Sequence, residues 1–255
     1  MFASSSLKGP TLLLLWLGAL FALSPSSWCA DLIQLQAGEV SFVACEVDLR
    51  KDRLAMFWKS GNGEIYGSFA ALEALLHEQG TKLVCGTNGG IFDESQKPLG
   101  LYIENGRLLR RINLRRGAYG NFYLQPNGVF ALKDERAEIV TTDEYEAKPV
   151  AEKQRIRFAI QSGPVLLRNG EMNPLFIAGS TNLTTRNAVC VRDPTDVALV
   201  AAQDPVNFYY FALALRDRFR CQSALYLDGS LSTFYPSKRL PQSRPLAVLF
   251  AVTAP

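Results

Sequence analysis

The chain has 255 residues, 48% of them hydrophobic and 20% charged, which is typical of a folded globular protein and excludes a disordered or fibrous one. With 27 basic and 24 acidic residues, the net charge of +3 is too near neutral to indicate nucleic-acid binding. A single histidine, His77, excludes sites that need two imidazoles, so acid–base chemistry is expected to fall to carboxylates, Lys, Tyr or Cys.

Residues 1–30 have the organisation of a secretory signal peptide. One charge, Lys8, precedes an apolar run over 11–23, and a small-residue stretch with Ser27 and Cys29 follows. The run is shorter than the roughly 20 residues of a membrane span, and an uncleaved N-terminal anchor is the alternative. We expect an exported protein, periplasmic or secreted, whose residues 31–255 form one domain that meets a membrane only through an uncleaved leader.

Export would place the cysteines in an oxidising compartment. Cleavage near Cys29 leaves an even number, which permits two disulfides. A buried free thiol is equally compatible with each position, and the spacing does not define a connectivity. The four remaining cysteines are Cys45, Cys85, Cys190 and Cys221.

The first half of the mature chain alternates strand-like runs with one helix. The runs over 40–49 and 54–58 predict a hairpin. A helix is predicted over 68–79, with His77 near its apolar stripe, and it is expected to sit at the surface rather than in a site. An apolar strand over 82–86 then leads into a glycine turn.

Turn residues predict two more hairpins in the middle of the chain. The first spans 101–110 with Asn105-Gly106 at its tip, and the second spans 121–132 around Pro126-Asn127-Gly128. The charged segment 134–155 predicts a surface excursion rather than a domain boundary.

The second half predicts further strands and one more helix. The helix is expected over 205–220, with Pro205 in its first turn. The predicted strands are 165–167, 188–191, 197–202, 224–227 and 246–252. The sum is a single α+β domain of mostly antiparallel, hairpin-rich sheet with two main helices.

Polar clusters at strand ends are the candidates for a functional site. The first is Asn88-Gly89-Gly90 with Asp93, where glycines would let a ligand approach the backbone; a tight turn capped by Asp93 is the alternative. The second is Gln161 and Ser162 before Gly163-Pro164. Because no histidine is available to activate Ser162, a hydrogen-bonding or turn role is favoured over a nucleophile.

Two more clusters follow along the chain. Residues 180–187 combine hydroxyls and amides with Arg186, which suits a phosphate or carboxylate, although a solvated loop is the alternative. Within this cluster, Asn182-Leu183-Thr184 also matches an N-glycosylation acceptor. The fourth cluster is Asp228-Gly229-Ser230 with Ser232, compatible both with a catalytic or sugar-binding turn and with a turn in which Asp228 bonds its own backbone.

The order of these clusters resembles the phosphodiester glycosidase family, whose domain occurs in a lysosomal enzyme and in many exported bacterial proteins. The resemblance covers about residues 40–250 and implies one cleft around Asn88 to Gly90, Arg186 and Asp228-Gly229. Ser230-Leu231-Ser232 departs from the further glycines of the lysosomal branch, so the sugar is left open. The segments that carry the resemblance are 88–92, 100–101, 105–106, 120–122, 161–164, 185–189, 205–208 and 225–230.

The resemblance implies hydrolysis of a sugar joined through its anomeric carbon to a phosphodiester, with release of the sugar and a phosphate monoester. A phosphate leaves readily, since its second pKa is about 6, so Arg186 is expected to neutralise it. Asp228 is the first candidate for the carboxylate that activates water or attacks the sugar, followed by Asp93 and then Glu104. The expected substrate-binding residues are Asn88, Gly89, Gly90, Gln161, Ser162, Gly229, Ser230 and Ser232.

Two other functions stay open at this stage. The same residues suit a non-catalytic protein that binds or assembles an envelope polysaccharide or glycan phosphate. A metal-dependent phosphodiesterase is disfavoured because histidine ligands are nearly absent. No cofactor or metal is expected, although Ca²⁺ or Mg²⁺ bound by carboxylates stays open.

Overall fold

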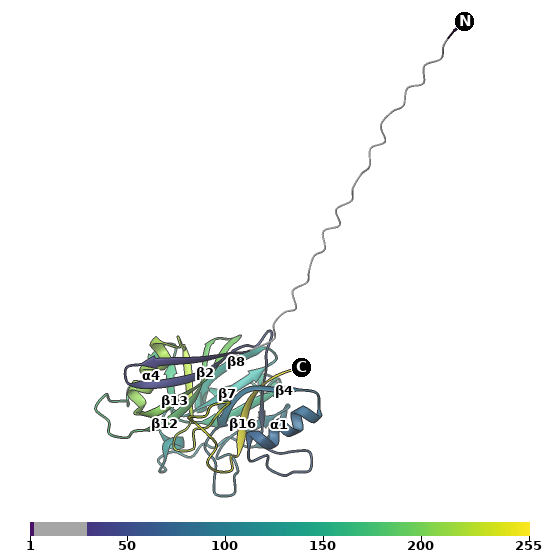
Figure 1. Cartoon of the computed structure of the whole chain (residues 1–255). Coiled ribbons are helices and arrows are strands. Elements are labelled where there is room, and N and C mark those ends of the chain that lie inside the picture. Colours follow the sequence, from purple (N-terminus) through teal and green to yellow (C-terminus); the bar gives the residue numbers. More distant parts are fainter. Residues whose placement is uncertain (3–29) are drawn as a thin grey trace.

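The computed structural model describes Met1, Phe2 and residues 30–255, so the predicted leader lies outside the described residues. The described chain is a single α+β domain with three antiparallel sheets, as predicted. The two main helices, α1 (Phe69–Glu78) and α4 (Phe208–Asp217), lie on opposite sides of the sheets (Figure 1). No helix in the described part of the chain has the length and apolar character to cross a membrane.

The largest sheet has seven strands in the order β1-β2-β13-β12-β14-β10-β11. The predicted hairpin between 40–49 and 54–58 is wrong, because β2 pairs with β1 and β13 instead. Hydrophobic alternation identifies a strand but not its partner. The strands are β1 (Asp31–Ala37), β2 (Val40–Asp48), β10 (Val165–Arg168), β11 (Glu171–Met172), β12 (Thr184–Asp193), β13 (Asp196–Val206) and β14 (Ser223–Asp228).

The second sheet has five strands in the order β6-β5-β9-β7-β8. Its β5–β6 hairpin confirms the turn predicted at Asn105-Gly106. The hairpin predicted over 121–132 is wrong, because β7 pairs with β8 across Asp134 and with β9 on its other side. The strands are β5 (Tyr102–Glu104), β6 (Arg107–Arg110), β7 (Gly128–Lys133), β8 (Arg136–Thr141) and β9 (Phe158–Ser162).

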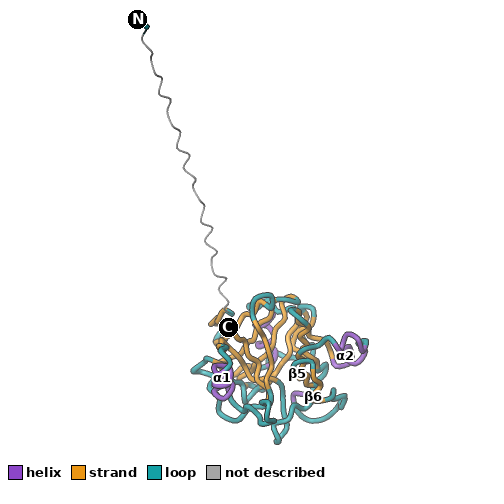
Figure 2. The backbone as a smooth tube through the Cα atoms, turned by 90° about the vertical axis from the view of Figure 1, so that its right-hand side faces the viewer, coloured by secondary structure: helices purple, strands orange, loops and turns teal. Residues whose placement is uncertain are grey.

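The segment 121–155 contains three short helices besides these strands. A 3-10 turn, η1 (Asn121–Tyr123), occupies the first arm of the wrongly predicted hairpin. The charged excursion 134–155 is only partly at the surface, because β8 joins the sheet while α2 (Thr142–Ala147) and α3 (Val150–Gln154) follow it. Figure 2 shows α2 at the edge of the molecule.

The third sheet has four strands in the order β15-β4-β16-β3. Its β4 continues beyond the predicted end at residue 86, so Asn88 and Gly89 lie within the strand rather than in a turn. The strands are β3 (Arg53–Phe57), β4 (Lys82–Gly89), β15 (Phe234–Tyr235) and β16 (Val248–Ala254).

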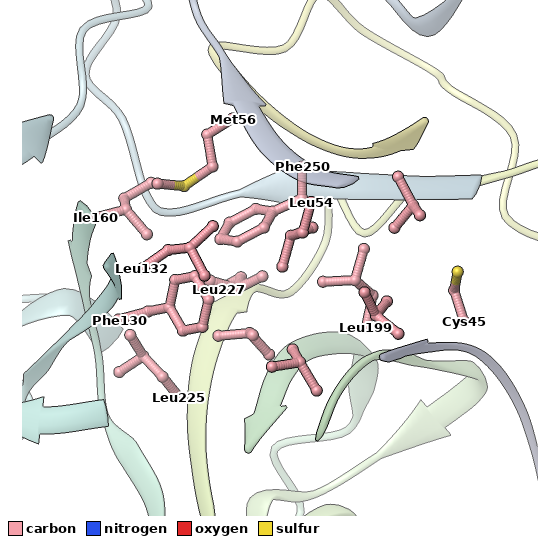
Figure 3. Packing of buried hydrophobic residues seen from close by; sticks show 14 of the residues in the cluster. Cys45, Leu54, Met56, Phe130, Leu132, Ile160, Leu199, Leu225, Leu227 and Phe250 are labelled. Atoms are coloured by element: carbon pink, nitrogen blue, oxygen red, sulfur yellow. The ribbon is translucent and has the colours of Figure 1, made fainter. Parts of the chain in front are cut away.

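One hydrophobic interior lies between the three sheets. Leu225 and Leu227 of β14, Phe130 of β7 and Phe250 of β16 point into it from different sheets (Figure 3). Since side chains alternate along a strand, Tyr226 between the two leucines faces the other side, toward α4. Because of this alternation, one side of β14 packs in the core, and the other side, with Tyr226, carries the polar groups.

A capping side chain marks the start of each of the two main helices. In α1, the Ser68 hydroxyl accepts a hydrogen bond from the backbone N–H of Ala71 at 3.1 Å, and His77 is exposed, as expected. The predicted start of the second helix at Pro205 is wrong, because Pro205 belongs to β13 and the Asn207 side chain caps α4. A proline suits the first turn of a helix, but here the strand pairing extends past it.

Two disulfides join the four described cysteines. Cys45 of β2 is bonded to Cys85 of β4, which connects the seven-stranded and four-stranded sheets. Cys190 of β12 is bonded to Cys221, just before β14. The sequence permitted bridges but did not define these pairs, since each joins residues that only the fold brings together.

We expect replacement of both Cys190 and Cys221 by Ala to lower the free energy of unfolding by about 3–4 kcal/mol, because this bridge closes a 31-residue loop. Urea unfolding of the oxidised parent and the double variant measures the difference. Both proteins are compared without a reductant, so that the Cys45–Cys85 bridge stays intact in each. A loss below about 1 kcal/mol would contradict a structural role for the bridge.

Candidate active site

The ends of four strands from all three sheets meet at one place. Asp228 ends β14, Asn187 lies beside it in β12, Asn88 comes from β4, and Ser162 ends β9. Asn88 Nδ2 donates to Asp228 Oδ2 at 3.5 Å, and Ser162 Oγ donates to the carbonyl oxygen of Leu227 at 3.3 Å. The structure therefore brings residues from all four predicted clusters together.

Asn187 is the hydrogen-bonding centre of this cluster, and its side chain is fully buried. Its Nδ2 donates to Thr87 Oγ1 and to the carbonyl oxygen of Asn88, both at 2.7 Å. Its Oδ1 accepts from the backbone N–H of Asp228 at 2.8 Å and from Ser232 Oγ at 3.4 Å. Asn187 had no role predicted from the sequence. A polar residue directly before the apolar run 188–191 was the available signal.

The Asp228 carboxyl is the titratable group of the cluster. Burial raises the pKa of Asp228 to about 6, and hydrogen bonds from the backbone N–H groups of Gly229 and Leu231 oppose that rise. The Gly229 N–H lies 2.6 Å from Asp228 Oδ1, so the self-capping turn is present. The carboxyl can thus change its protonation state close to neutral pH.

Arg186 is fully buried in β12, which contradicts the alternative of a solvated loop. Its Nε donates to the carbonyl oxygen of Val206 at 2.7 Å, and its Nη2 donates to the carbonyl and Oδ1 oxygens of Asn182 at 2.9 and 3.0 Å. The guanidinium carbon lies 3.7 Å from the centre of the Phe208 ring. Burial lowers the pKa of Arg186, but a guanidinium stays charged in proteins.

The remaining nitrogen of this guanidinium, Nη1, is buried and forms no hydrogen bond of good geometry among the described residues, although the Tyr226 hydroxyl lies close to the same guanidinium. A buried charged donor without an acceptor is costly. Nη1 therefore marks a position where an anionic oxygen would satisfy the site.

Tyr226 lies beside Arg186, whose guanidinium carbon is 5.7 Å from the centre of the Tyr226 ring. Burial raises the pKa of the Tyr226 hydroxyl well above its usual value, the Arg186 charge lowers that pKa and the Asp228 charge raises it. Asn121 Nδ2 donates to Tyr226 Oη at 3.4 Å, and a Cβ added to Gly229 would collide with the same oxygen. Within an apolar strand, Tyr226 looked like a core residue, so sequence reasoning gave it no role.

Two predicted site residues serve the local framework instead. Asp93 Oδ1 accepts from the backbone N–H groups of Ser95 and Lys97 at 2.9 and 3.0 Å, which closes a turn and leaves Asp93 outside the cluster. Gln161 Oε1 accepts from the N–H of Leu101 at 3.1 Å and from that of Asn113 at 2.8 Å. Gln161 is thus occupied in tying two loops to β9.

The two glycines after Asn88 serve packing rather than ligand approach. A Cβ at Gly89 would lie 2.9 Å from the Phe250 ring, and one at Gly90 would lie 2.6 Å from Ile160. Gly90 also has a positive φ of 37°. Ser230 is exposed beyond the turn.

Glu104 lies outside the cluster, in β5. Its Oε2 accepts from Tyr102 Oη at 2.7 Å and from the backbone N–H of Trp58 at 3.1 Å, and burial raises its pKa.

Among residues 1–2 and 30–255, no three His, Cys, Asp or Glu side chains gather in a way that could hold a metal ion.

Residues 81–252 match the phosphodiester glycosidase family. The chain belongs to this family. The match contains Asn88, Ser162, Arg186, Asn187 and Asp228, so the whole cluster lies in the family's domain. The chain is also 36% identical over 206 residues to the uncharacterized protein YigE of Escherichia coli K12, covering 81% of this chain and 78% of that protein.

Solved structures share the fold of this phosphodiester glycosidase domain. One is the catalytic domain of zebrafish N-acetylglucosamine-1-phosphodiester alpha-N-acetylglucosaminidase, auto-inhibited by its pro-peptide, with a TM-score of 0.55, 17% identity and coverage of 87% of this chain and 81% of that chain. Another is a hypothetical protein from Synechocystis, with a TM-score of 0.53, 13% identity and coverage of 88% and 61%. At these identities the likeness concerns the fold alone. The family expected from the ordered motifs is confirmed.

Proposed function

We propose that this protein is an exported hydrolase that cleaves the glycosidic bond of a sugar-1-phosphodiester and releases the sugar and a phosphate monoester. The observation that carries this proposal is the fully buried Arg186, whose Nη1 forms no hydrogen bond of good geometry, next in β12 to Asn187, which holds the half-buried Asp228. Membership of the phosphodiester glycosidase family supports hydrolysis of this class. The two disulfides support an oxidising compartment and hence export.

Arg186 is assigned to the phosphate. When the bond between the anomeric carbon and the bridging oxygen breaks, the electron pair moves to the phosphate oxygen. Nη1 would bind a phosphate oxygen and offset this growing charge, and it needs no reorganisation because Val206 and Asn182 already hold the guanidinium. A phosphate monoester departs without a strong general acid, since its second pKa is about 6.

Asp228 is assigned to the water. Its carboxylate would accept a proton from the water that attacks the oxocarbenium-like anomeric carbon. Asp93 and Glu104 lie outside the cluster, so no second carboxylate of the sequence-predicted set stands opposite Asp228. This supports a single displacement by water over a covalent glycosyl intermediate. Asn88, which donates to Oδ2, would orient the carboxylate.

The assignment predicts an acidic limit to activity. Because the base must be ionised and its pKa is about 6, kcat/KM is expected to fall about tenfold for each pH unit below that value. Above it, the rate is expected to level off. A pH–rate profile from pH 4 to 9 on a substrate whose own ionisation lies below pH 2 measures this. A flat profile through pH 5 would contradict a base at Asp228.

The reaction itself is tested by incubating the purified protein with UDP-linked sugars and alkyl sugar-1-phosphodiesters and measuring free sugar. Arg186→Ala is expected to lower kcat/KM by about 10²–10³-fold. The matched carboxylate control is Asp93→Asn, which keeps the turn cap and is expected to retain activity within about twofold.

Isotope position separates this reaction from its alternatives. In ¹⁸O-labelled water, the label is expected in the released sugar, because water attacks carbon. Label in the phosphate together with release of sugar-1-phosphate would show P–O cleavage and overturn the proposal. Tight binding of these compounds without any release would show a binding module instead.

A further inference from the structure

The surface next to Tyr226 has an unusual charge distribution. We define the basic rim as residues 105–124, which run from the β5–β6 turn to η1. The rim contains five arginines and no acidic residue, whereas the rest of 31–255 contains 21 basic and 24 acidic residues. The only ion pair that the rim forms among the described residues joins Arg116 to Asp143. The rim is thus a strongly basic segment of an otherwise slightly acidic domain.

The same rim exposes large apolar side chains between its arginines. Leu114 is 54% exposed and Tyr119 is fully exposed. Leu108, Leu109 and Leu124 are also exposed. Basic and bulky apolar side chains thus alternate along one exposed segment, a composition that matches the interface of an anionic lipid layer, where the charges meet headgroups and the apolar groups enter the acyl boundary.

The rim is attached to the candidate active site. Asn121, near its end, donates to Tyr226 Oη. Asn113, in its middle, is held by Gln161. Figure 2 places β5 and β6 at the side of the molecule that carries α2. A layer bound to the rim would therefore lie beside the phosphate position at Arg186.

A second loop at the site has a compatible surface. Residues 172–185 contain no charged side chain, and Leu175, Ile177 and Leu183 are each more than half exposed. Asn182 of this loop holds Arg186, while Asn207 Nδ2 donates to the carbonyl oxygens of Ala178 and Ser180. Both loops that reach the site thus lack carboxylates that an anionic surface would repel.

We propose that the basic rim docks this domain on an anionic lipid surface, so that the site faces a membrane-borne phosphodiester. This departs from the expectation that the protein meets a membrane only through its leader. The docking step stands independently of the hydrolysis proposed above; only the membrane-borne substrate rests on that function.

The test is flotation of the released protein with phosphatidylcholine vesicles, with and without phosphatidylglycerol. Binding is expected only to the anionic vesicles and is expected to weaken with salt. Arg111→Ala combined with Arg115→Ala is expected to weaken it about 25-fold, at about 1 kcal/mol for each basic residue. Leu114→Ser combined with Tyr119→Ser is expected to weaken it at least about tenfold.

The control removes the same charge elsewhere, through Arg136→Ala combined with Arg244→Ala, both exposed and outside the rim. If the control variant retains vesicle binding within about twofold, the effect of charge is local to the rim. If the control variant loses as much binding as the rim variant, the effect is one of net charge and the proposal is overturned. If replacing Leu114 and Tyr119 does not weaken vesicle binding, the rim fits a soluble polyanion rather than a lipid layer, and the proposal is also overturned.

Hydrolysis of a soluble substrate is a separate readout. All rim variants are expected to hydrolyse it at the parent rate. Absence of hydrolysis in the parent would remove the proposed reaction while leaving the vesicle result intact.

Discussion

Replacing Asp228 by Asn is expected to lower kcat/KM on a sugar-1-phosphodiester by about 10²–10⁴-fold, the contribution usual for a positioned general base. The amide is close to the carboxyl in size and can still accept the Gly229 N–H. It cannot take a proton from water. Steady-state kinetics of the parent and the variant measure the change, and a loss below about threefold would contradict the assignment.

The same substitution is expected to stabilise the fold near pH 7. Burial raises the folded-state pKa of Asp228 from 3.8 to about 6, so its contribution to stability is fully present below pH 3.8 and is lost as the pH rises through about 6. The ionised carboxylate then costs up to about 3 kcal/mol, at 1.36 kcal/mol per pKa unit. Asn removes this cost.

Urea unfolding at pH 4 and pH 7 separates this effect from a general repacking. The parent is expected to lose stability from pH 4 to 7 by up to about 3 kcal/mol more than Asp228→Asn does. Asp93→Asn provides the matched control, because Asp93 is a turn residue outside the cluster. Equal pH dependence in the parent and in Asp228→Asn would contradict a raised pKa at this residue.

Replacing Asn187 by Ala is expected to lower the free energy of unfolding by about 3–5 kcal/mol. The change leaves the backbone N–H of Asp228 and the carbonyl oxygen of Asn88 without their partner, at about 1–3 kcal/mol for each buried group. It also opens a cavity between β4 and β12. Calorimetry or urea unfolding measures the loss.

Asn187 is a positioning residue, since it holds Asp228 through the backbone. Asn187→Ala is expected to lower activity and to displace the acidic limb of the pH–rate profile, which a purely structural role would not move. A double-mutant cycle with Asp228→Asn is expected to be non-additive, because both changes act through one carboxyl. Additive losses would show that Asn187 acts elsewhere. Asn187→Asp, which keeps Oδ1 but removes the Nδ2 donor, isolates the contacts to Thr87 and Asn88.

Short-range sequence patterns predicted the elements that depend on neighbouring residues. The helical spacing of apolar residues over 68–79 predicted α1, and Asn105-Gly106 predicted the β5–β6 turn because both residues accept a positive φ. Pro205 misled for the same reason: its preference for a first helical turn is local, whereas the pairing of β13 with its neighbours extends past it. A propensity is overridden where a neighbouring strand offers more hydrogen bonds.

The site residues also divide into those that the sequence indicated and those that only the fold identifies. Arg186 and Asp228 stood out in the sequence because charged residues beside buried strands are rare and costly. Asp93 was the second candidate, and only the fold excludes it from the cluster, since its carboxylate closes the 93–97 turn. The sequence did not indicate Asn187, because its hydrogen bonds form only when β4 lies beside β12.

The sequence by itself determined the α+β class, the alternation that builds the core, the family and the presence of charged groups at strand ends. These depend on the period of the side chains and on the chemistry of single residues, which neighbours in the chain decide. The tertiary structure alone decided how the strands are ordered in the three sheets, which cysteines bond and which of the candidate carboxylates joins the cluster around Asn187. Those features join residues that are distant in sequence, and their energies arise only when the three sheets close around one interior.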